Sequence, residues 1–413
     1  MNLLRLGWKN LLHQPWSTAL SLVLAALGAG LISLLLQVNQ QLNQQFERNL
    51  AGIDMVLGAK GSPLQLILSG MYHVDAPTGN IPIAECKAFL NPRHPLIGMA
   101  VPLSLGDSHN GYRIVGATHD ILKLYDAKLA AGRAWEAPLE VVAGAAVARK
   151  LGLKLGDTFH SSHGFIEDPD LVHHDAGAFK VVGILKSTGA VADQLLLTAN
   201  ESVWVVHEHA AASPDTAAAQ PAPGLRPLTD FPDRDITLIL IKFKARNAQT
   251  LNMPRNINEN TNLQAAVPAI EISRLYATMG AGERSLRWIA AVIIGVSILS
   301  IFISLFANLN NRRYELALMR VMGASRSRLF TLLLLEGVLL AAIGCALGLM
   351  LSHGGMAVVA RYLTEAYRYD FQPWALLPAE GWLLGGAIGL GALASLVPAI
   401  RASRTDIHNT LAE

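Results

Sequence analysis

The segment RRYELALMRVMGASRSRL, residues 312–329, is a basic and partly apolar stretch between two long runs that contain almost no charge. Those runs are 286–309 and 329–352. The first part of the segment can form a short helix with Leu and Met side chains on one side and charged side chains around the rest, which Gly323 would end. We therefore predict an amphipathic helix at a membrane surface, between two transmembrane helices.

The composition is typical of a membrane protein. Of the 413 residues, 52% are hydrophobic and only 15% are charged, which is too apolar for an ordinary soluble protein of this length. The formal net charge is +2, so no overall basic excess favours a nucleic-acid partner. Cys345 lies inside an apolar run and Cys86 lies outside these runs, so we expect no disulfide between them.

Four runs are long enough to cross a bilayer, because a helix of about 20 residues spans a hydrocarbon core of about 30 Å. They are 16–38, 286–309, 329–352 and 381–400. A cleaved signal peptide is the alternative for the first run, since Arg5 and Lys9 precede it. That run is too long for a typical signal peptide, and Gln-rich sequence follows it. The sequence therefore predicts a membrane α-helical fold with four transmembrane helices.

Lys and Arg residues near the runs set the expected orientation. They gather before the first run, between the second and third, and after the fourth: Arg5, Lys9, Arg312, Arg313, Arg320, Arg326, Arg328, Arg401 and Arg404. Arg284 and Arg287 oppose this pattern but are outnumbered. We expect three segments in the cytoplasm and two on the opposite side of the membrane. The cytoplasmic segments are 1–15, 310–328 and 401–413, and the segments on the opposite side are 39–285 and 353–380.

The long external segment, 39–285, predicts an α+β domain inserted between the first two transmembrane helices. Apolar residues recur every four positions from Val38 to Leu50, so the first helix is expected to continue as a stalk. A second amphipathic stretch, 269–285, precedes the second run. Two such stalks could pack together, or each could simply cover the core of the domain.

Between the two stretches, short β-rich pieces are broken by Gly, Pro, Asn and Asp. The predicted strands lie within 98–105, 112–118, 139–147, 179–185, 194–198 and 235–245. The segment 210–227 is rich in Ala and Pro without periodicity, which predicts a flexible linker inside the domain.

The stretch ELALMRVMGAS, residues 315–325, resembles the cytoplasmic coupling segment of FtsX-like permeases. These are the four-span permease subunits of MacB/LolC-type (type VII) ABC transporters, so the resemblance implies a bacterial inner membrane with the segments 39–285 and 353–380 in the periplasm. Three other places resemble the same family in the same order: WKNLLHQPWSTAL (8–20), AVARKLGLKLGDTF with FKVVGILKSTG (146–159 and 179–189), and PAIRAS (398–403). One departure is Asp406–Ile407, where the family commonly has Asp-Pro, and it weakens only the match of the tail.

The resemblance implies that the short helix docks in a groove of a separate ATP-binding ABC subunit. Polar contacts would come from Glu315 and Arg320, apolar contacts from Leu316, Met319 and Met322, and Gly323 would end the helix. The alternative is that these Arg residues only follow the positive-inside rule and reach lipid phosphates. The chain contains no G-x-x-x-x-G-K-[ST] motif, and Gly58–Ser62 has the wrong spacing, so we expect no ATP hydrolysis in this chain.

Further partners also follow from the resemblance. Four-span permeases of this family work in pairs, so we expect a second permease copy or a paralogue, membrane lipids, and a periplasmic protein or substrate. The substrate would be zinc-related, or a lipoprotein, peptide or lipophilic compound. The alternatives are an FtsX-like activator of a periplasmic hydrolase and a periplasmic metal-binding sensor. Transport predicts a surface that accepts a ligand, whereas activation predicts a stable protein partner.

A histidine-rich loop, HSSHGFIEDPDLVHHDAG at 160–177, suggests a metal site. Its candidate ligands are His160, His163, His173, His174 and Asp175. Imidazole and carboxylate groups suit zinc, although no strict ligand spacing defines a known site. A solvated polar loop is the alternative. His207 and His209 would add ligands if the fold brings them near.

Two other polar features carry weaker expectations. Tyr72, His73 and Asp75 lie together, but no nucleophile accompanies them, and a turn explains them without catalysis. Glu336 lies inside the third apolar run, where a charge is costly, so it should face a neighbouring helix, a partner or water near the cytoplasmic end.

Overall fold

The computed structural model describes residues 3–13, 15–163, 177–211, 225–311, 313–367 and 371–403. The chain forms two compact units. The helical unit comprises Met1–Asn43 and Met279–Glu413, and the core unit comprises Gln44–Thr278. Most of the predicted linker 210–227 and of the tail 401–413 lies outside the described residues.

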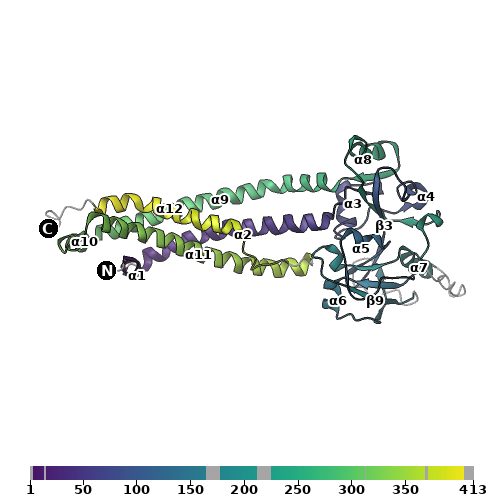
Figure 1. The fold of residues 1–413 in the computed structure, drawn as a ribbon, viewed down its shortest axis with the longest axis horizontal. Coiled ribbons are helices and arrows are strands. Elements are labelled where there is room, and N and C mark those ends of the chain that lie inside the picture. Colours follow the sequence, from purple (N-terminus) through teal and green to yellow (C-terminus); the bar gives the residue numbers. More distant parts are fainter. Residues whose placement is uncertain are drawn as a thin grey trace. The chain divides into compact units, whose positions relative to one another are not determined.

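Long helices dominate the helical unit (Figure 1). The helices that enter it are α1 (Leu3–His13), α2 (Pro15–Leu50), α9 (Pro268–Asn311), α10 (Arg313–Val321), α11 (Arg326–Tyr367) and α12 (Pro378–Ser403). Of these, α2, α9, α11 and α12 are long and apolar enough to cross a membrane. The four predicted apolar helices are therefore confirmed.

Three of these helices extend well beyond their apolar runs. Helix α2 continues to Leu50 and α9 begins at Pro268, as the stalk prediction required. Helix α11 continues to Tyr367, although 353–380 was expected to be a loop. Hydropathy identifies only the part of a helix that can lie in lipid. Adding turns to a helix that has already formed costs little free energy, so a helix can continue beyond its apolar part. The sequence after Ser352 also contains no proline before Pro373, so nothing stops the helix early.

Small residues let the backbones of neighbouring helices touch inside the helical unit. A Cβ atom on Gly348 of α11 would lie 2.6 Å from the carbonyl oxygen of Ala26 on α2, and one on Gly30 would lie 2.9 Å from the carbonyl oxygen of Gly348. Between α11 and α12, a Cβ atom on Gly337 would lie 2.6 Å from the Cβ atom of Ser395. Such contacts replace the hydrophobic driving force that lipid does not provide.

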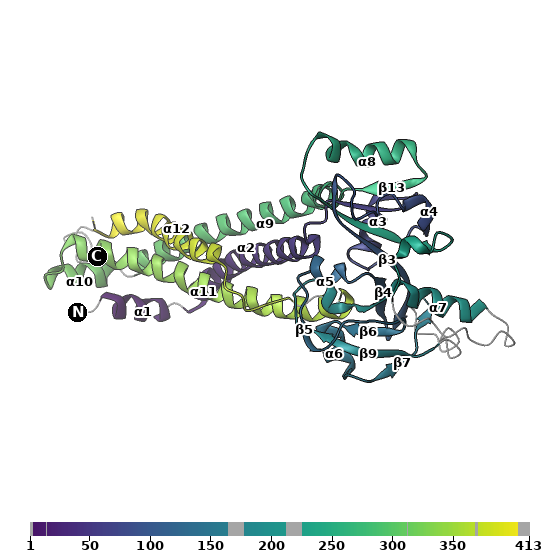
Figure 2. The ribbon, with the colours of Figure 1, turned by 45° about the vertical axis from the view of Figure 1, so that its right-hand side comes forward.

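The core unit is built on one large mixed sheet (Figure 2). Its strand order is β13-β1-β12-β3-β4-β10-β6-β9-β5. The strands are β1 (Met55–Ala59), β3 (Ile97–His109), β4 (Tyr112–Ala117), β5 (Leu129–Gly132), β6 (Glu140–Ala143), β9 (Phe179–Leu185), β10 (Leu196–Thr198), β12 (Leu238–Phe243) and β13 (Leu263–Ala266). Two short strands join it at β9 and β3, namely β7 (Thr158–Phe159) and β8 (Ser162–His163), and β2 (Ile81–Pro82) pairs separately with β11 (Asp235–Ile236).

The hairpin β3–β4 turns at Asn110 and Gly111, whose φ angles are 46° and 69°. Two successive positive φ angles suit an Asn-Gly pair, and the resulting turn matches the twist of the strands that it joins. Each of the six predicted strands overlaps an observed strand. The short strands β1, β2, β5, β7, β8 and β13 were not predicted.

Both faces of the sheet are buried. On β1, Val56 faces one hydrophobic cluster, while Met55 and Leu57 face another. The helices of the core unit are α3 (Pro63–Gly70), α4 (Ile83–Cys86), α5 (Asp120–Leu124), α6 (Ala145–Leu151), α7 (Asn200–Ala211) and α8 (Ala248–Asn260). Figure 2 shows α8 beside β13 and α6 beside β9. Because both faces are covered, the strands are almost continuously apolar instead of alternating.

We predict that Gly348→Ala lowers the thermal unfolding midpoint of the purified chain in detergent, because the new methyl group would meet backbone atoms of α2. Gly354→Ala, on the same helix, is the matched control, since a Cβ atom there would meet nothing within 4 Å. The control should keep or slightly raise the midpoint, as expected from helix propensity. Equal midpoints for both variants would contradict the close packing of α2 and α11.

Candidate functional site

Helix α10 is the short amphipathic helix between α9 and α11. It spans Arg313–Val321 and is followed by Gly323, whose φ angle of 95° is readily adopted only by glycine. The amide of Gly323 donates to the carbonyl of Arg320, and that of Ala324 donates to the carbonyl of Met319. These bonds close the helix at the predicted position.

One face of α10 is buried within the chain itself. Leu316 is 4% exposed, and Ala317 is fully buried. Leu316 belongs to one apolar cluster with residues of α9, α11 and α12, whose other buried members are Leu309, Leu329, Leu333, Ala399 and Ala402. Met319 is partly buried and packs against the same cluster. The expectation that Leu316 fills a groove of a partner therefore needs correction, because its side chain is already buried in this chain.

The opposite face of α10 is apolar and exposed. Its exposed side chains are Tyr314 at 62%, Leu318 at 44%, Val321 at 59% and Met322 at 73%. Their spacing places them on one side of a helix. Glu315 is also exposed, and Arg320 is half-buried. Of the predicted apolar contact residues, Met322 lies on this exposed face, whereas sequence analysis missed Leu318 and Val321.

The N-terminal helix α1 accounts for the buried glutamate of α11. Asn10 donates its side-chain amide to Oε1 of Glu336 at 2.5 Å, and both residues are at most 5% exposed. Leu11 packs in a cluster with residues of α9 and α11, including Leu305 and Leu340. Glu336 thus faces a neighbouring helix, and the contact fixes α1 against α11.

The last turns of α2 are attached to the core unit by polar and apolar contacts. Asn49 is fully buried, and its Oδ1 accepts a hydrogen bond of 2.8 Å from the amide of Val191. Gln45 donates to the carbonyl of Gly189 at 3.3 Å. Phe46 and Leu50 pack against the large core cluster that also includes Ile272 of α9. Both predicted stalks therefore end on the core of the domain.

The loop that receives Asn49 is shaped by Asp193. Its carboxylate accepts hydrogen bonds from the amides of Thr188 and Gly189 and from the hydroxyls of Ser187 and Thr188, at 2.8–3.0 Å. Asp193 lies in the short 3₁₀ helix η2 (Val191–Gln194). A carboxylate that collects several donors holds the loop in one conformation, which presents the amide of Val191 to Asn49.

The turn that contains His73 is held by Arg113 of β4. The guanidinium donates to the carbonyl oxygens of His73 and Asp75, at 3.5 and 2.6 Å. Burial and, to a smaller extent, the charge of Arg113 lower the pKa of His73 to about 3. Burial likewise lowers the pKa of Arg113 to about 10. This arrangement supports the turn interpretation of Met71–Pro77.

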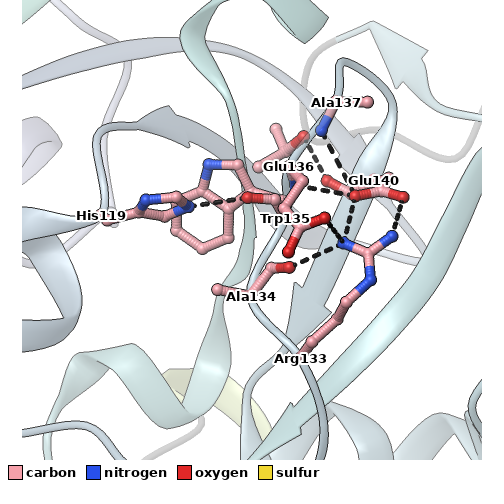
Figure 3. Close-up of polar contacts among 8 residues, drawn as sticks. His119, Arg133, Ala134, Trp135, Glu136, Ala137 and Glu140 are labelled. Atoms are coloured by element: carbon pink, nitrogen blue, oxygen red, sulfur yellow. Dashed lines mark hydrogen bonds and ion pairs between the residues drawn. The ribbon is translucent and has the colours of Figure 1, made fainter. Parts of the chain in front are cut away.

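Polar contacts also fix the loop before β6 (Figure 3). Arg133 forms an ion pair with Glu140, which also accepts from the amides of Glu136 and Ala137. The hydrogen bond from Arg133 is the main reason why the pKa of Glu140 is lowered. His119 contacts the carbonyl oxygen of Trp135 at 2.7 Å, and the Trp135 ring is fully buried. We assign these residues a structural role.

Each unit also contains a cavity. In the core unit, a cleft of about 440 Å³ lies between the start of β3, α5 and the loops at 90–92 and 227–229. Its lining combines apolar residues such as Met99 and Leu228 with Thr118 and Lys123. In the helical unit, a cavity of about 210 Å³ lies between α2, α9, α11 and α12, and its lining is mainly apolar. The core cleft has the size of a small-ligand site.

The predicted metal ligands are largely beyond the described part of the chain. His173, His174 and Asp175 lie outside the described residues, as does the side chain of His163. His160 is exposed, and its carbonyl oxygen lies 3.0 Å from Nδ1 of His109. Among the residues that the structure describes, no group of three His, Cys, Asp or Glu side chains could hold a metal ion.

Comparison with known families decides the identity. The family model described as the MacB-like periplasmic core domain matches residues 18–251, and that of the FtsX-like permease C-terminal matches residues 287–407. The chain belongs to the FtsX/MacB family of ABC transporter permeases. This finding confirms the resemblance that was based on the coupling segment and the core motifs.

Two individual proteins are similar to this permease. An uncharacterized ABC transporter permease protein of Mycobacterium tuberculosis is 32% identical over 133 residues, which are 31% of this chain and 16% of that protein. The chain thus matches about one sixth of the length of that relative. A crystal structure of a permease domain from Porphyromonas gingivalis covers 52% of this chain and 86% of its own, with 13% identity and a TM-score of 0.22. A score this low carries no argument about the fold.

The low pKa of His73 predicts an acid-sensitive core unit. The unfolded chain takes up a proton near the ordinary pKa of 6.5, whereas the folded chain does so only near pH 3. Stability should therefore be lost as pH falls from 6.5 towards 3, by up to about 1.4 kcal/mol per pH unit. His73→Asn should reduce this loss of stability, because the Asn side chain does not take up a proton. Asn also tolerates the φ angle of 53° at this position, so the backbone should keep its conformation. Identical pH profiles of chemical unfolding would contradict this origin.

Zinc binding by the histidine-rich loop stays a prediction. Replacing His160, His163, His173 and His174 by Ala should abolish binding of one zinc ion, measured by calorimetry on the full chain. Replacing His94 and His119, which lie elsewhere in the core unit, serves as the control. If the quadruple variant binds as much zinc as the unaltered protein, the loop is only a solvated segment.

Proposed function

We propose that this chain is the permease subunit of a MacB/LolC-type ABC transporter whose separate ATP-binding subunit docks on the exposed face of α10. The observation that carries this proposal is the division of α10 into a face buried in the chain and an exposed apolar face. A soluble partner can cover the exposed face, because Leu318, Val321 and Met322 form a compact anchor. Glu315 and Arg320 would supply polar contacts near this anchor.

The buried face of α10 supports a role in transmitting force. Leu316 packs in one cluster with residues at the ends of α9, α11 and α12, and Met319 packs against the same cluster, so a partner that moves α10 would also move these helices. Interiors of this kind are close-packed and resist compression. In this proposal, closure of two ATP-binding subunits pulls on two permease copies, or on this chain and a paralogue.

The continuous helices α2 and α9 support transmission to the core unit. Neither helix is interrupted between its apolar part and the turns that attach to the core cluster. A continuous helix is stiffer than a loop of equal length. With both termini in the cytoplasm, as the positive-inside rule predicts, the core unit would lie in the periplasm of a bacterial inner membrane.

The cleft in the core unit favours transport over activation of a hydrolase. A concave site with an apolar lining and a few polar groups suits an amphipathic ligand better than a flat protein interface. We propose that a periplasmic substrate of peptide or lipophilic character is handled at this domain. The ATP-driven movement would then displace it within the periplasm.

We predict that the double variant Leu318→Asp, Met322→Asp loses the ATP-binding subunit during purification from the native membrane. Two carboxylates on the exposed face would have to be buried without partners. Leu251→Asp is the matched control, because Leu251 is a 72% exposed leucine on α8 of the core unit. The ATPase activity that copurifies with the tagged permease should fall at least tenfold in the double variant and stay unchanged in the control. Normal copurification of the double variant would contradict the docking face.

A further inference from the structure

A network of buried polar side chains joins α2, α11 and α12 in the helical unit. Its members are Ser33 and Gln37 on α2, Ser352 and His353 on α11, and Glu380 in the first turn of α12, and all are at most 6% exposed. Gln37 donates to Oγ of Ser352 at 3.1 Å and to Oε1 of Glu380 at 3.0 Å. Ser33 donates to the same carboxylate oxygen at 2.9 Å. Burying this many polar groups costs free energy unless they hydrogen-bond to one another. Polar and ionisable groups inside membrane helices are therefore candidates for a functional role.

The orientation of His353 fixes where its protons lie. Its Nδ1 atom is 2.7 Å from the carbonyl oxygen of Pro373 and 3.3 Å from Nε2 of Gln37. A carbonyl oxygen can only accept a hydrogen bond, and this contact is the shorter of the two, so we assign a hydrogen to Nδ1. The ring also stacks on Trp374, with 5.9 Å between the ring centroids. The other ring nitrogen, Nε2, therefore points to Oε1 of Glu380, 3.4 Å away.

This geometry requires one additional proton. With a neutral ring and an ionised carboxylate, a lone pair on Nε2 would face a negatively charged oxygen in a site shielded from water. A proton on Nε2 converts this repulsion into an ion pair. The carboxylate already accepts from Ser33, Gln37 and the amide of Leu377, which is the donor pattern of an ionised Glu. The proton therefore belongs on the ring.

Few other titratable side chains lie near Glu380 that could carry the proton. Oε1 of Gln37 is buried and has no hydrogen-bond partner among the described residues, so the site is rich in acceptors. No titratable side chain occurs in 16–46 of α2, 288–311 of α9, 371–377 before α12 or 381–400 of α12. On α11, Cys345 interacts electrostatically with Glu380. His353 is thus the base available to Glu380.

We propose that His353 and Glu380 form a proton-binding site that fastens α2, α11 and α12 to one another. Loss of the proton removes the attraction between α11 and α12 and leaves a buried carboxylate facing a neutral ring. The packing of these helices then depends on pH. Along the sequence, the site lies where two apolar runs end, because Gln37 is near the end of 16–38 and Glu380 directly precedes 381–400.

Nitrogen NMR of the histidine side chains in the full chain, in lipid nanodiscs at pH 7, tests this site. The signals of His353 are assigned by their loss in His353→Gln. We expect both ring nitrogens to be protonated in the unaltered protein and only Nδ1 to be protonated in Glu380→Gln. Glu336→Gln, which alters the second buried carboxylate among the described residues of the helical unit, is the matched control and should leave the His353 signals unchanged.

Infrared spectroscopy provides a second readout that does not rely on Glu380→Gln folding normally. In His353→Gln, a protonated carboxyl band should appear that the unaltered protein lacks, because Glu380 must then take up a proton itself. A neutral His353 ring beside an ionised Glu380 in the unaltered protein would overturn the proposal. Equal effects of Glu380→Gln and Glu336→Gln would also overturn it. A third result would also overturn it: a change in the His353 signals when sodium replaces choline as the cation of the buffer. That result would assign the site to a metal cation.

Discussion

The hydrogen bond between Asn49 and the amide of Val191 is the contact on which the proposed use of α2 as a lever depends. It is buried completely, and it lies at the last turn of a helix that begins with the first apolar run. A buried hydrogen bond of this kind costs free energy to break, because the donor and the acceptor would both be left buried without a partner. The loop organised by Asp193 holds the donating amide of Val191 in place. The end of α2 is therefore fixed to the core of the domain, and in the proposed mechanism movement of the helix would be passed on to it.

Inside the helical unit, two kinds of contact hold the helices together, because the hydrophobic effect does not drive helix association in lipid. Glycine contacts such as Gly30 with Gly348 bring backbones together and depend on shape alone. Buried polar contacts, between Asn10 and Glu336 and around Glu380, add direction and restrict how the helices slide. The apolar cluster beneath α10 completes this arrangement at the other end of the helices. Together they give the unit a defined packing, which the proposed transmission of a displacement would require.

The sequence predicted the parts of the fold that are governed by hydropathy and local turns. Long uncharged runs gave the four apolar helices, and the pieces between turn residues gave six strands of the sheet. The extension of α11 to Tyr367 was missed because the apolar run ends at Ser352, whereas the helix continues beyond it. The face of α10 was assigned incorrectly at Leu316, since both of its faces carry apolar residues and only packing decides which one is buried. The His353–Glu380 pair was missed because its members lie on different helices, although each is a rare polar residue at the end of an apolar run.

The central claim is that ATP binding below the membrane changes the stalk ends of the permease. It is tested most directly by a spin-label distance between Gln40→Cys on α2 and Ala277→Cys on α9, two exposed positions, in the complex with its ATP-binding subunit. The native Cys86 and Cys345 are buried and should not take up the label. The account predicts that a non-hydrolysable ATP analogue shifts the distance distribution, and that the shift disappears when the exposed face of α10 carries charges. An unchanged distribution in a complex that binds the analogue would contradict it.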